Sequence, residues 1–348
     1  MKSEVRSQRS EVRKRNLSSV FCLLASALVA LSIAGCGPTF PKGEFKESII
    51  RLCKKEYKLD VKVKTVGKTV AIYVPLTNLL DFTFALTPDA GEKLNQVILS
   101  VTRVVLSTDA KYDFYCVIAH DVKIPEIQII IIKSVEDVRR FLLGDISRGE
   151  YGKRMLIDMR IAPQAQKERA IRDVFDRMKI DAKWQEGVMQ DFFMSEPTTL
   201  GDIGYWAGKF YIKDVKLTEF LADEIASRIK LSFRDDKVLA DSLALKAVKG
   251  LYFPGDTSNG GSGYFKVDIT AEPRTAEALS SKEVSDGLFS YALKVSYDVM
   301  HGYHFKDFDY VEIKSLADGR SSKVMKEDLD NYKPKKTKIE DVMVFDSF

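Results

Sequence analysis

The chain has 348 residues, of which 45% are hydrophobic and 30% are charged, with 54 basic and 50 acidic side chains. Residues 1–35 hold six of the basic and two of the acidic residues, so the remainder carries 48 of each sign and no formal net charge. This balance removes the basic footprint on which nucleic-acid binding depends, and we expect no nucleic-acid partner. The remainder is long and apolar enough to form two domains.

Residues 1–35 have the layout of a secretory signal peptide, in which a basic stretch precedes an apolar run and small residues. The run ends in Ile33-Ala34-Gly35-Cys36, which resembles the lipobox of bacterial lipoproteins, where an aliphatic residue stands three positions before an invariant cysteine. The resemblance covers the signal alone. It implies cleavage after Gly35 and lipidation of Cys36. The alternative is an uncleaved membrane helix that happens to end in cysteine.

Residues 36–43 would then be the lipidated cysteine and a short tether. At ~3.5 Å per residue the tether reaches about 25 Å, so the folded part stays close to its own leaflet. More than one acyl chain makes such an anchor stable. In related lipoproteins an aspartate after the cysteine often signals retention in the inner membrane. Gly37 occupies that position here, which favours the periplasmic face of the outer membrane if the organism has one.

Residues 44–145 are predicted to form a unit with the order helix, hairpin, helix, hairpin. Apolar residues recur at helical spacing in 45–57 and 92–107, although the valines of the second segment favour a strand by propensity. Alternating apolar residues predict four strands, at 60–64, 69–75, 112–119 and 126–132. The last strand is apolar on both sides and should be central in its sheet, with cover on both faces.

Residues 216–330 are predicted to repeat this order. The pattern indicates helices at 217–231 and 283–301, and strands at 242–253, 264–270, 309–316 and 322–326. Residues 146–215 are expected to form a mostly helical connecting segment, with a capping box at Ser147-Arg148-Gly149-Glu150 and a helix at 164–180. Residues 331–348 are expected to form a polar C-terminal tail. The predicted fold class is α+β, with two structurally similar units. Each is expected to be a four-stranded antiparallel sheet with two helices on one face.

Cys53 and Cys116 remain after the signal peptide and the lipidated residue are set aside. Cys53 lies on the apolar stripe of its predicted helix, and Cys116 lies in the middle of a predicted strand. Both are expected to point into one core, which would allow a disulfide in an oxidising compartment. Two separate buried thiols are the favoured interpretation, because cysteine is among the most buried residue types.

Motifs for chemistry are few. His301 and His304 form a pair at the end of a predicted helix and are candidate metal ligands, to which Asp307 or Asp309 could add carboxylates. A zinc site needs three or four ligands in defined geometry. The helix dipole explains such a pair without a metal. The glycine-rich loop 255–263 lacks the Gly-Lys-Ser/Thr ending of a phosphate-binding loop, and no Gly-x-Ser-x-Gly motif is present. We therefore expect no cofactor and no enzymatic activity.

Aromatic residues gather near the junction of the predicted units, with Tyr205, Trp206, Phe210 and Tyr211 foremost among them. They indicate an interface, formed either with a partner or between the two units. The sequence thus predicts an envelope lipoprotein that acts as a non-enzymatic binding, scaffold or assembly factor. Its expected partners are the membrane, through the lipid, and an envelope protein or polymer. A carrier of small molecules or lipids and a carboxylate-based hydrolase of envelope material are the alternatives.

Overall fold

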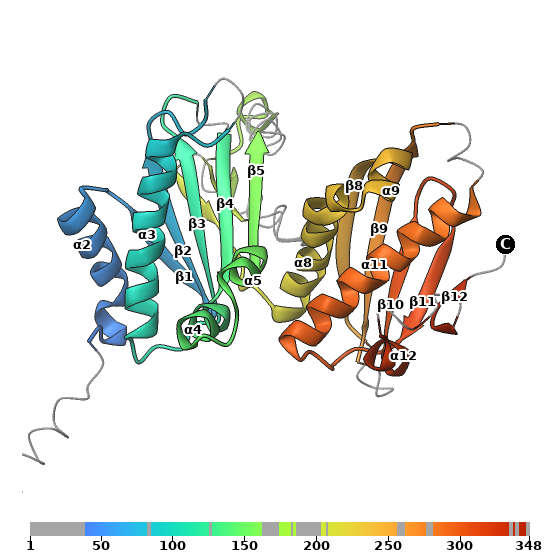
Figure 1. Ribbon diagram of the computed structural model, residues 1–348. Helices are drawn as coiled ribbons and strands as arrows, with labels where there is room; N and C mark the ends of the chain where they lie inside the picture. The colour runs from blue at the N-terminus through green and yellow to red at the C-terminus, as the bar shows by residue number, and fades with distance from the viewer. Residues whose placement is uncertain are drawn as a thin grey trace, which may run out of the picture.

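The computed structural model is a mixed α and β protein (Figure 1). It describes residues 39–81, 85–124, 127–161, 174–181, 184–185, 203–206, 208–255, 262–275, 281–333, 337 and 341–345. Residues 1–38, including the predicted signal peptide and Cys36, lie outside these ranges. Within the described ranges, no helix has the length and apolarity needed to cross a membrane.

The first half contains one five-stranded sheet with the strand order β1-β2-β3-β4-β5. Its elements, in chain order, are η1 (Lys42–Glu44), α2 (Phe45–Tyr57), β1 (Lys62–Val66), β2 (Thr69–Leu76), α3 (Pro88–Leu106), β3 (Phe114–Asp121), β4 (Ile127–Ser134), α4 (Val135–Leu143), α5 (Arg148–Lys153) and β5 (Met155–Ile161). The two predicted helices and four predicted strands of residues 44–145 are present, with ends shifted by a few residues.

The second half contains another five-stranded sheet, with the order β12-β11-β10-β9-β8. Its elements are α8 (Leu217–Ser232), η3 (Phe233–Asp235), α9 (Lys237–Ser242), β8 (Leu243–Phe253), β9 (Tyr264–Pro273), α11 (Lys282–Tyr303), β10 (Tyr310–Ser315), β11 (Ser321–Met325), α12 (Lys326–Asn331) and β12 (Val344–Phe345). A small hairpin of β6 (Gly204–Trp206) and β7 (Lys209–Tyr211) lies between the halves in sequence.

The prediction of four-stranded antiparallel sheets is wrong. Each sheet has five strands, and each contains one parallel pair, β2 with β3 and β9 with β10. The cause is the helix between the two hairpins. A helical crossover carries the chain back to the end of the sheet where the preceding strand began, so the next strand runs parallel to that strand. The hairpins themselves are antiparallel, as expected.

Local sequence signals explain where the main helices begin. Thr87 accepts a hydrogen bond from the amide of Ala90 and precedes Pro88, so α3 begins with a side-chain cap and a proline in its first turn. Ser147 accepts a hydrogen bond from the amide of Glu150 at the start of α5, where a capping box was predicted. The helical period of 92–107 prevailed over the strand propensity of its valines, because that period places one apolar stripe against the sheet.

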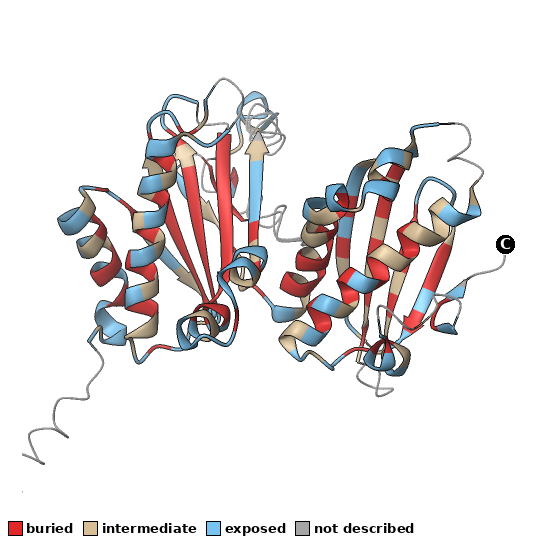
Figure 2. Cartoon of the chain, viewed as in Figure 1, coloured by how far each residue is buried: buried red, intermediate tan, exposed pale blue. Residues whose placement is uncertain are grey.

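The central strands of the first sheet, β2, β3 and β4, are buried on both faces. On one face, α2 and α3 form an apolar layer with alternate residues of β2, β3 and β4. On the other face, the remaining residues of these strands belong to a cluster that also contains β6, α8, α11 and the second sheet. Figure 1 shows α8 between the two sheets, and Figure 2 shows the central strands of the first sheet buried along their length. The two halves therefore share one hydrophobic core.

The strand at Ile127–Ser134 confirms the expectation of cover on both faces, since all eight positions of β4 are buried.

The two cysteines lie on opposite faces of the first sheet. Cys53 belongs to the layer of α2 and α3, whereas Cys116 belongs to the cluster shared with the second half. Both are free and buried. The expectation that both point into one core is therefore wrong, because Cys116 lies on the opposite face of the sheet from α2. The two residues are separate buried thiols, the interpretation that the sequence favoured over a disulfide.

Residues 146–215 were expected to be mostly helical, but their described part is not. After α5 it contributes the edge strand β5 and the β6–β7 hairpin. The helix predicted at 164–180 falls largely outside the described residues, with 174–177 helical.

The C-terminal region also differs from the prediction of a polar tail. Tyr332, Val342 and Met343 are buried, and β12 adds a fifth strand to the second sheet.

Candidate functional site

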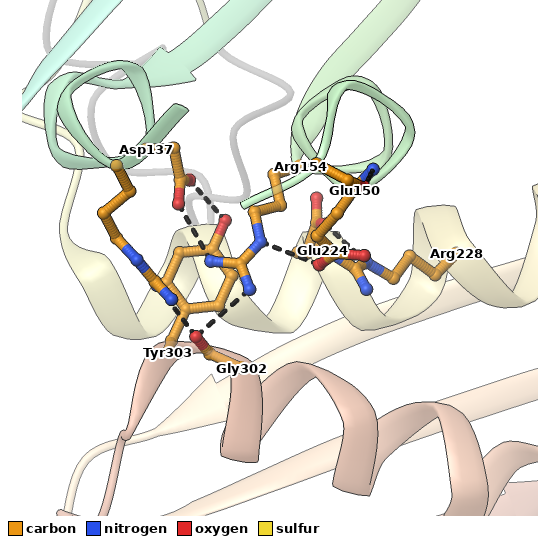
Figure 3. Close-up of polar contacts among 9 residues, drawn as sticks. Asp137, Glu150, Arg154, Glu224, Arg228, Gly302 and Tyr303 are labelled. Carbon is orange, nitrogen blue, oxygen red and sulfur yellow. Dashed lines mark hydrogen bonds and ion pairs between the residues drawn. The ribbon is translucent and has the colours of Figure 1, made fainter. Parts of the chain in front are cut away.

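Charged side chains from three helical regions, α4, α5 and α8, meet polar groups of α11 in a buried network (Figure 3). Its centre is Arg154, directly after α5, whose side chain is 3% exposed. The guanidinium donates to Asp137 Oδ1 of α4 at 2.9 Å and to Glu150 Oε1 of α5 at 2.8 Å. It also donates to the carbonyl of Gly302 in α11 at 3.1 Å. Arg154 thus joins the first half to the second.

Tyr303 contributes to the network in two ways. Its hydroxyl donates to Asp137 Oδ2 at 2.6 Å, and its ring lies 4.5 Å from the centre of the Arg154 guanidinium. The carbonyl of Gly302 accepts a second hydrogen bond, from Arg140, at 2.9 Å. A Cβ on Gly302 would stand 2.7 Å from Arg154 Nη2. A side chain at that position would therefore displace the guanidinium.

Arg228 of α8 extends the network. It donates to Glu150 Oε1 at 2.9 Å, from the second half to the first, and to Glu224 Oε1 at 2.7 Å within its own helix. Glu224 has no exposed side-chain surface, and its Oε2 has no hydrogen-bond partner among the described residues. A buried carboxylate oxygen without a donor is unfavourable, so the neutral acid is favoured at this position.

The environments of the two glutamates separate their pKa values. Burial raises the pKa of Glu224 to about 7, although the charge and hydrogen bond of Arg228 act in the opposite direction. Burial also disfavours ionised Glu150, but hydrogen bonds and charges from Arg154 and Arg228 hold its pKa below the ordinary value. Burial, together with the carboxylates of Glu224 and Asp137, raises the pKa of the Tyr303 hydroxyl.

Two carboxyl groups with separated pKa values are also what a carboxylate-based hydrolase requires. Access decides against that role for this pair. Glu224 is 0% exposed, and neither it nor Glu150 lines the groove described next. The neutral acid is therefore closed off from solvent by the described residues. The arrangement suits a structural connection between the halves, in which directional bonds fix their orientation.

A groove of about 450 Å³ lies beside the network, between the first sheet and the second half. Buried Ile130, Ile132 and Leu156 form its floor. Its wall includes successive residues of the edge strand β5, and its other side is formed by α8 and β8. Charged residues surround the apolar floor: Asp158, Arg160, Asp223, Lys230 and Lys249. The groove can thus hold a ligand that is apolar on one side and polar on the other.

The aromatic residues predicted at an interface contact the first sheet. Tyr205 and Trp206 are buried, and Tyr205 stacks on Tyr73 of β2 with ring centroids 3.7 Å apart. Gln128 of β4 exchanges hydrogen bonds with the backbone of Tyr205. Phe210 lies 5.1 Å from Tyr205, centroid to centroid, and Tyr211 is half-buried at the end of β7. Contacts within the chain therefore account for these side chains.

The histidine pair lies at the end of α11. The rings of His301 and His304 are 6.1 Å apart, and His301 stacks on Tyr297. Nearby Asp309 accepts hydrogen bonds from the amides of Ser262 and Gly263. In the described ranges, no group of three or more His, Cys, Asp or Glu side chains has the arrangement of a metal site.

The sequence analysis missed the network, apart from the role of Glu150 in capping. Two signals could have revealed it. Glu150 and Arg154, like Glu224 and Arg228, are spaced four residues apart, as helical ion pairs are. Glu224 also lies beside Ile225 on the apolar stripe of its helix, and a charged residue on such a stripe requires a buried partner.

Comparison with known proteins supplies no relative. No protein-family model matches the chain, and neither a curated protein nor a solved structure matches it. Any functional assignment therefore depends on the residues and geometry described above.

Proposed function

We propose that this protein is a lipid-anchored envelope lipoprotein that holds a polypeptide partner near the membrane as a non-enzymatic binding or scaffold factor. Cys36 carries the lipid, on the periplasmic face of the outer membrane where the organism has one. The observation that carries the binding role is the groove between the halves, which combines an apolar floor, an exposed strand edge and a charged rim.

The position of the N-terminus supports the anchor. The amide of Phe40 donates to the carbonyl of Ser107, so the chain joins the fold four residues after Cys36. Four residues span at most about 15 Å. In Figure 1, α2 lies on the side of the first half that is remote from the second half. An anchor at this end would hold the first half at the bilayer and direct the second half away from it.

Substitution of Cys36 tests the anchor. The wild-type chain should label with palmitate and partition into detergent. Cys36→Ser should be unprocessed or soluble, and should not label. A mutant that behaves like the wild type in both measurements would exclude the lipoprotein assignment. Co-purification from native membranes tests the partner, because recovery of a lipid or a small molecule in place of a protein would favour a carrier.

The groove also makes a small-molecule carrier the second candidate. Its volume lies within the range of ligand pockets, about 300–1,000 Å³. Five charged side chains and a strand edge in its wall suit a polypeptide better than a lipid chain.

We also infer that the two halves are a structural duplication. Both have the order helix, hairpin, helix, hairpin, fifth strand, and the pairing directions follow the same sequence of antiparallel, parallel, antiparallel, antiparallel. The test is superposition in an experimentally determined structure. Strands β1–β5 should overlay β8–β12 with α2 on α8 and α3 on α11, and an overlay in another order would contradict the duplication.

A further inference from the structure

The four outer strands of the two sheets differ in how their edges are protected. Exposed strand edges invite pairing with other chains, and proteins protect them with lysines, bulges or very short strands. β1 carries exposed Lys62 and Lys64, and β12 has only two residues. β8 has an irregularity between Leu245 and Ala247, and carries two lysines.

β5 has none of these protections. Its seven residues contain no lysine, no proline and no register shift, and among the strands described it pairs with β4 alone. Ile157 and Met159 are 58% and 43% exposed, on the side of the sheet that bears α2 and α3. The layer of α2 and α3 therefore stops short of this strand. An added strand would cover these two apolar side chains and satisfy the backbone groups beside them.

The opposite side of β5 faces the groove. Leu156 contributes to the floor, and Asp158 is held by Arg160 at 2.9 Å. Lys230 and Lys249 lie on the facing wall, and neither ammonium group forms an ion pair within the described ranges. The charged lining residues are thus two acids, Asp158 and Asp223, against three bases, Arg160 and the two lysines. The rim therefore has an excess of positive charge.

We propose that β5 is a docking edge for an extended polypeptide segment in which apolar and acidic residues alternate. Successive side chains of a strand point to opposite faces. The apolar residues would cover Ile157 and Met159, and the acidic residues would face Lys230 and Lys249 in the groove. Backbone hydrogen bonds to β5 would supply the binding, and the two faces would supply the selectivity.

This inference rests on the proposed binding function but not on the anchor, and the two fail separately. Palmitate labelling tests the anchor without the groove, and peptide binding tests the groove without the anchor. The probes are three fluorescent peptides of about nine residues, long enough to pair along all seven residues of β5. The first alternates valine and glutamate. The second alternates valine and lysine. The third repeats the first with alternate amides N-methylated, which removes hydrogen-bond donors.

The full chain in detergent should bind the valine-glutamate peptide at least about tenfold more tightly than the other two, measured by fluorescence anisotropy. Hydrogen exchange should slow at the amides of residues 155–161. Ile157→Lys, at an exposed position, should abolish binding because it removes an apolar contact and gives this edge a lysine, as on β1 and β8. Lys230→Glu with Lys249→Glu should reverse the preference between the acidic and basic peptides. The matched control, Lys46→Glu with Lys58→Glu on exposed positions around α2, should preserve it.

Several outcomes would overturn the proposal. They are absence of binding, binding unaffected by N-methylation, or protection of amides outside β5. A concentration-dependent dimer that Ile157→Lys dissolves would identify a second copy of the chain as the occupant, and would also overturn it.

Discussion

The two five-stranded sheets have the same strand order and pairing directions but differ in how their faces are covered. β4 of the first sheet is buried at every position, whereas β10 of the second alternates between buried and partly exposed residues. The face of the second sheet away from α8 and α11 carries a ladder of stacked rings, Phe253, Tyr264 and Tyr310, with centroids 4.9 and 4.6 Å apart. Such cross-strand aromatic pairs stabilise a sheet.

The first sheet therefore depends on the second half of the chain to cover one of its two faces. That face is covered by the β6–β7 hairpin and by α8, and the buried ion network stands at the same junction. Apolar contacts alone would allow several orientations of one half on the other. Hydrogen-bonded charges allow few, because each misplaced partner leaves a buried charge unpaired. The predictions below test this division of roles.

The largest effect is expected for Arg154→Met. The substitution leaves Asp137 buried with the Tyr303 hydroxyl as its remaining partner in the network, and removal of one member of a buried pair costs about 3–5 kcal/mol of unfolding free energy. Urea unfolding measures the loss. The matched control is Arg103→Met, whose partner Glu56 is 35% exposed and whose loss should be about 0–1 kcal/mol. Equal losses in the two variants would contradict a special role for the network.

The next effect concerns pH. The pKa of Glu224 is about 7 in the folded state against an ordinary value of 4.5, so between these pH values the folded state holds a proton that the unfolded state lacks. The contribution of this group to stability therefore falls as pH rises from 4.5 to 7, by up to roughly 3 kcal/mol.

Glu224→Gln should lose this pH-dependent contribution, which makes the difference in unfolding free energy between wild type and variant change across that pH window. The exposed variant Glu136→Gln serves as the control. If the wild type and Glu224→Gln respond identically to pH, the carboxyl is ionised throughout and the assignment is wrong.

A smaller loss is expected for Tyr303→Phe, which keeps the ring against Arg154 and removes the hydrogen bond to Asp137. A hydrogen bond to a charged group contributes about 1.5–3 kcal/mol. Thermal or urea unfolding gives the value. Tyr57→Phe, in the layer of α2 and α3, should change stability by less than about 0.5 kcal/mol. A loss no larger than that of the control would show that the hydroxyl adds nothing to the junction.

The smallest effects compare the two faces of the first sheet through adjacent residues of β4. Ile130→Val removes a methylene from the layer shared with the second half, and Ile131→Val removes one from the layer of α2 and α3. Each should cost about 0.5–1.5 kcal/mol. The protection of backbone amides from native-state hydrogen exchange should fall mainly in α8 for the first variant and in α3 for the second. The same pattern for both variants would contradict the separation into two layers.

Sequence patterns predicted the local elements of both halves well. The helix expected at 45–57 is α2 with the same bounds, because one apolar stripe at helical spacing needs no information from distant residues. Alternation predicted the hairpin strands for the same reason. β5 was missed because its seven residues, MLIDMRI, lie in a segment that was interpreted as helical as a whole, and Leu156 interrupts their alternation.

The sequence by itself therefore determined the period of each segment. The periods in turn determined the helices and strands, and they showed that Ile127–Ser134 needs cover on both faces. The tertiary structure decided the parallel pairs, the separation of Cys53 from Cys116, and the network. Glu150 and Arg228 are 78 residues apart, and Asp137 and Tyr303 are 166 apart. Local spacing carries no information on such distant partners, because their contact depends on how two independently patterned halves come together to bury a shared face.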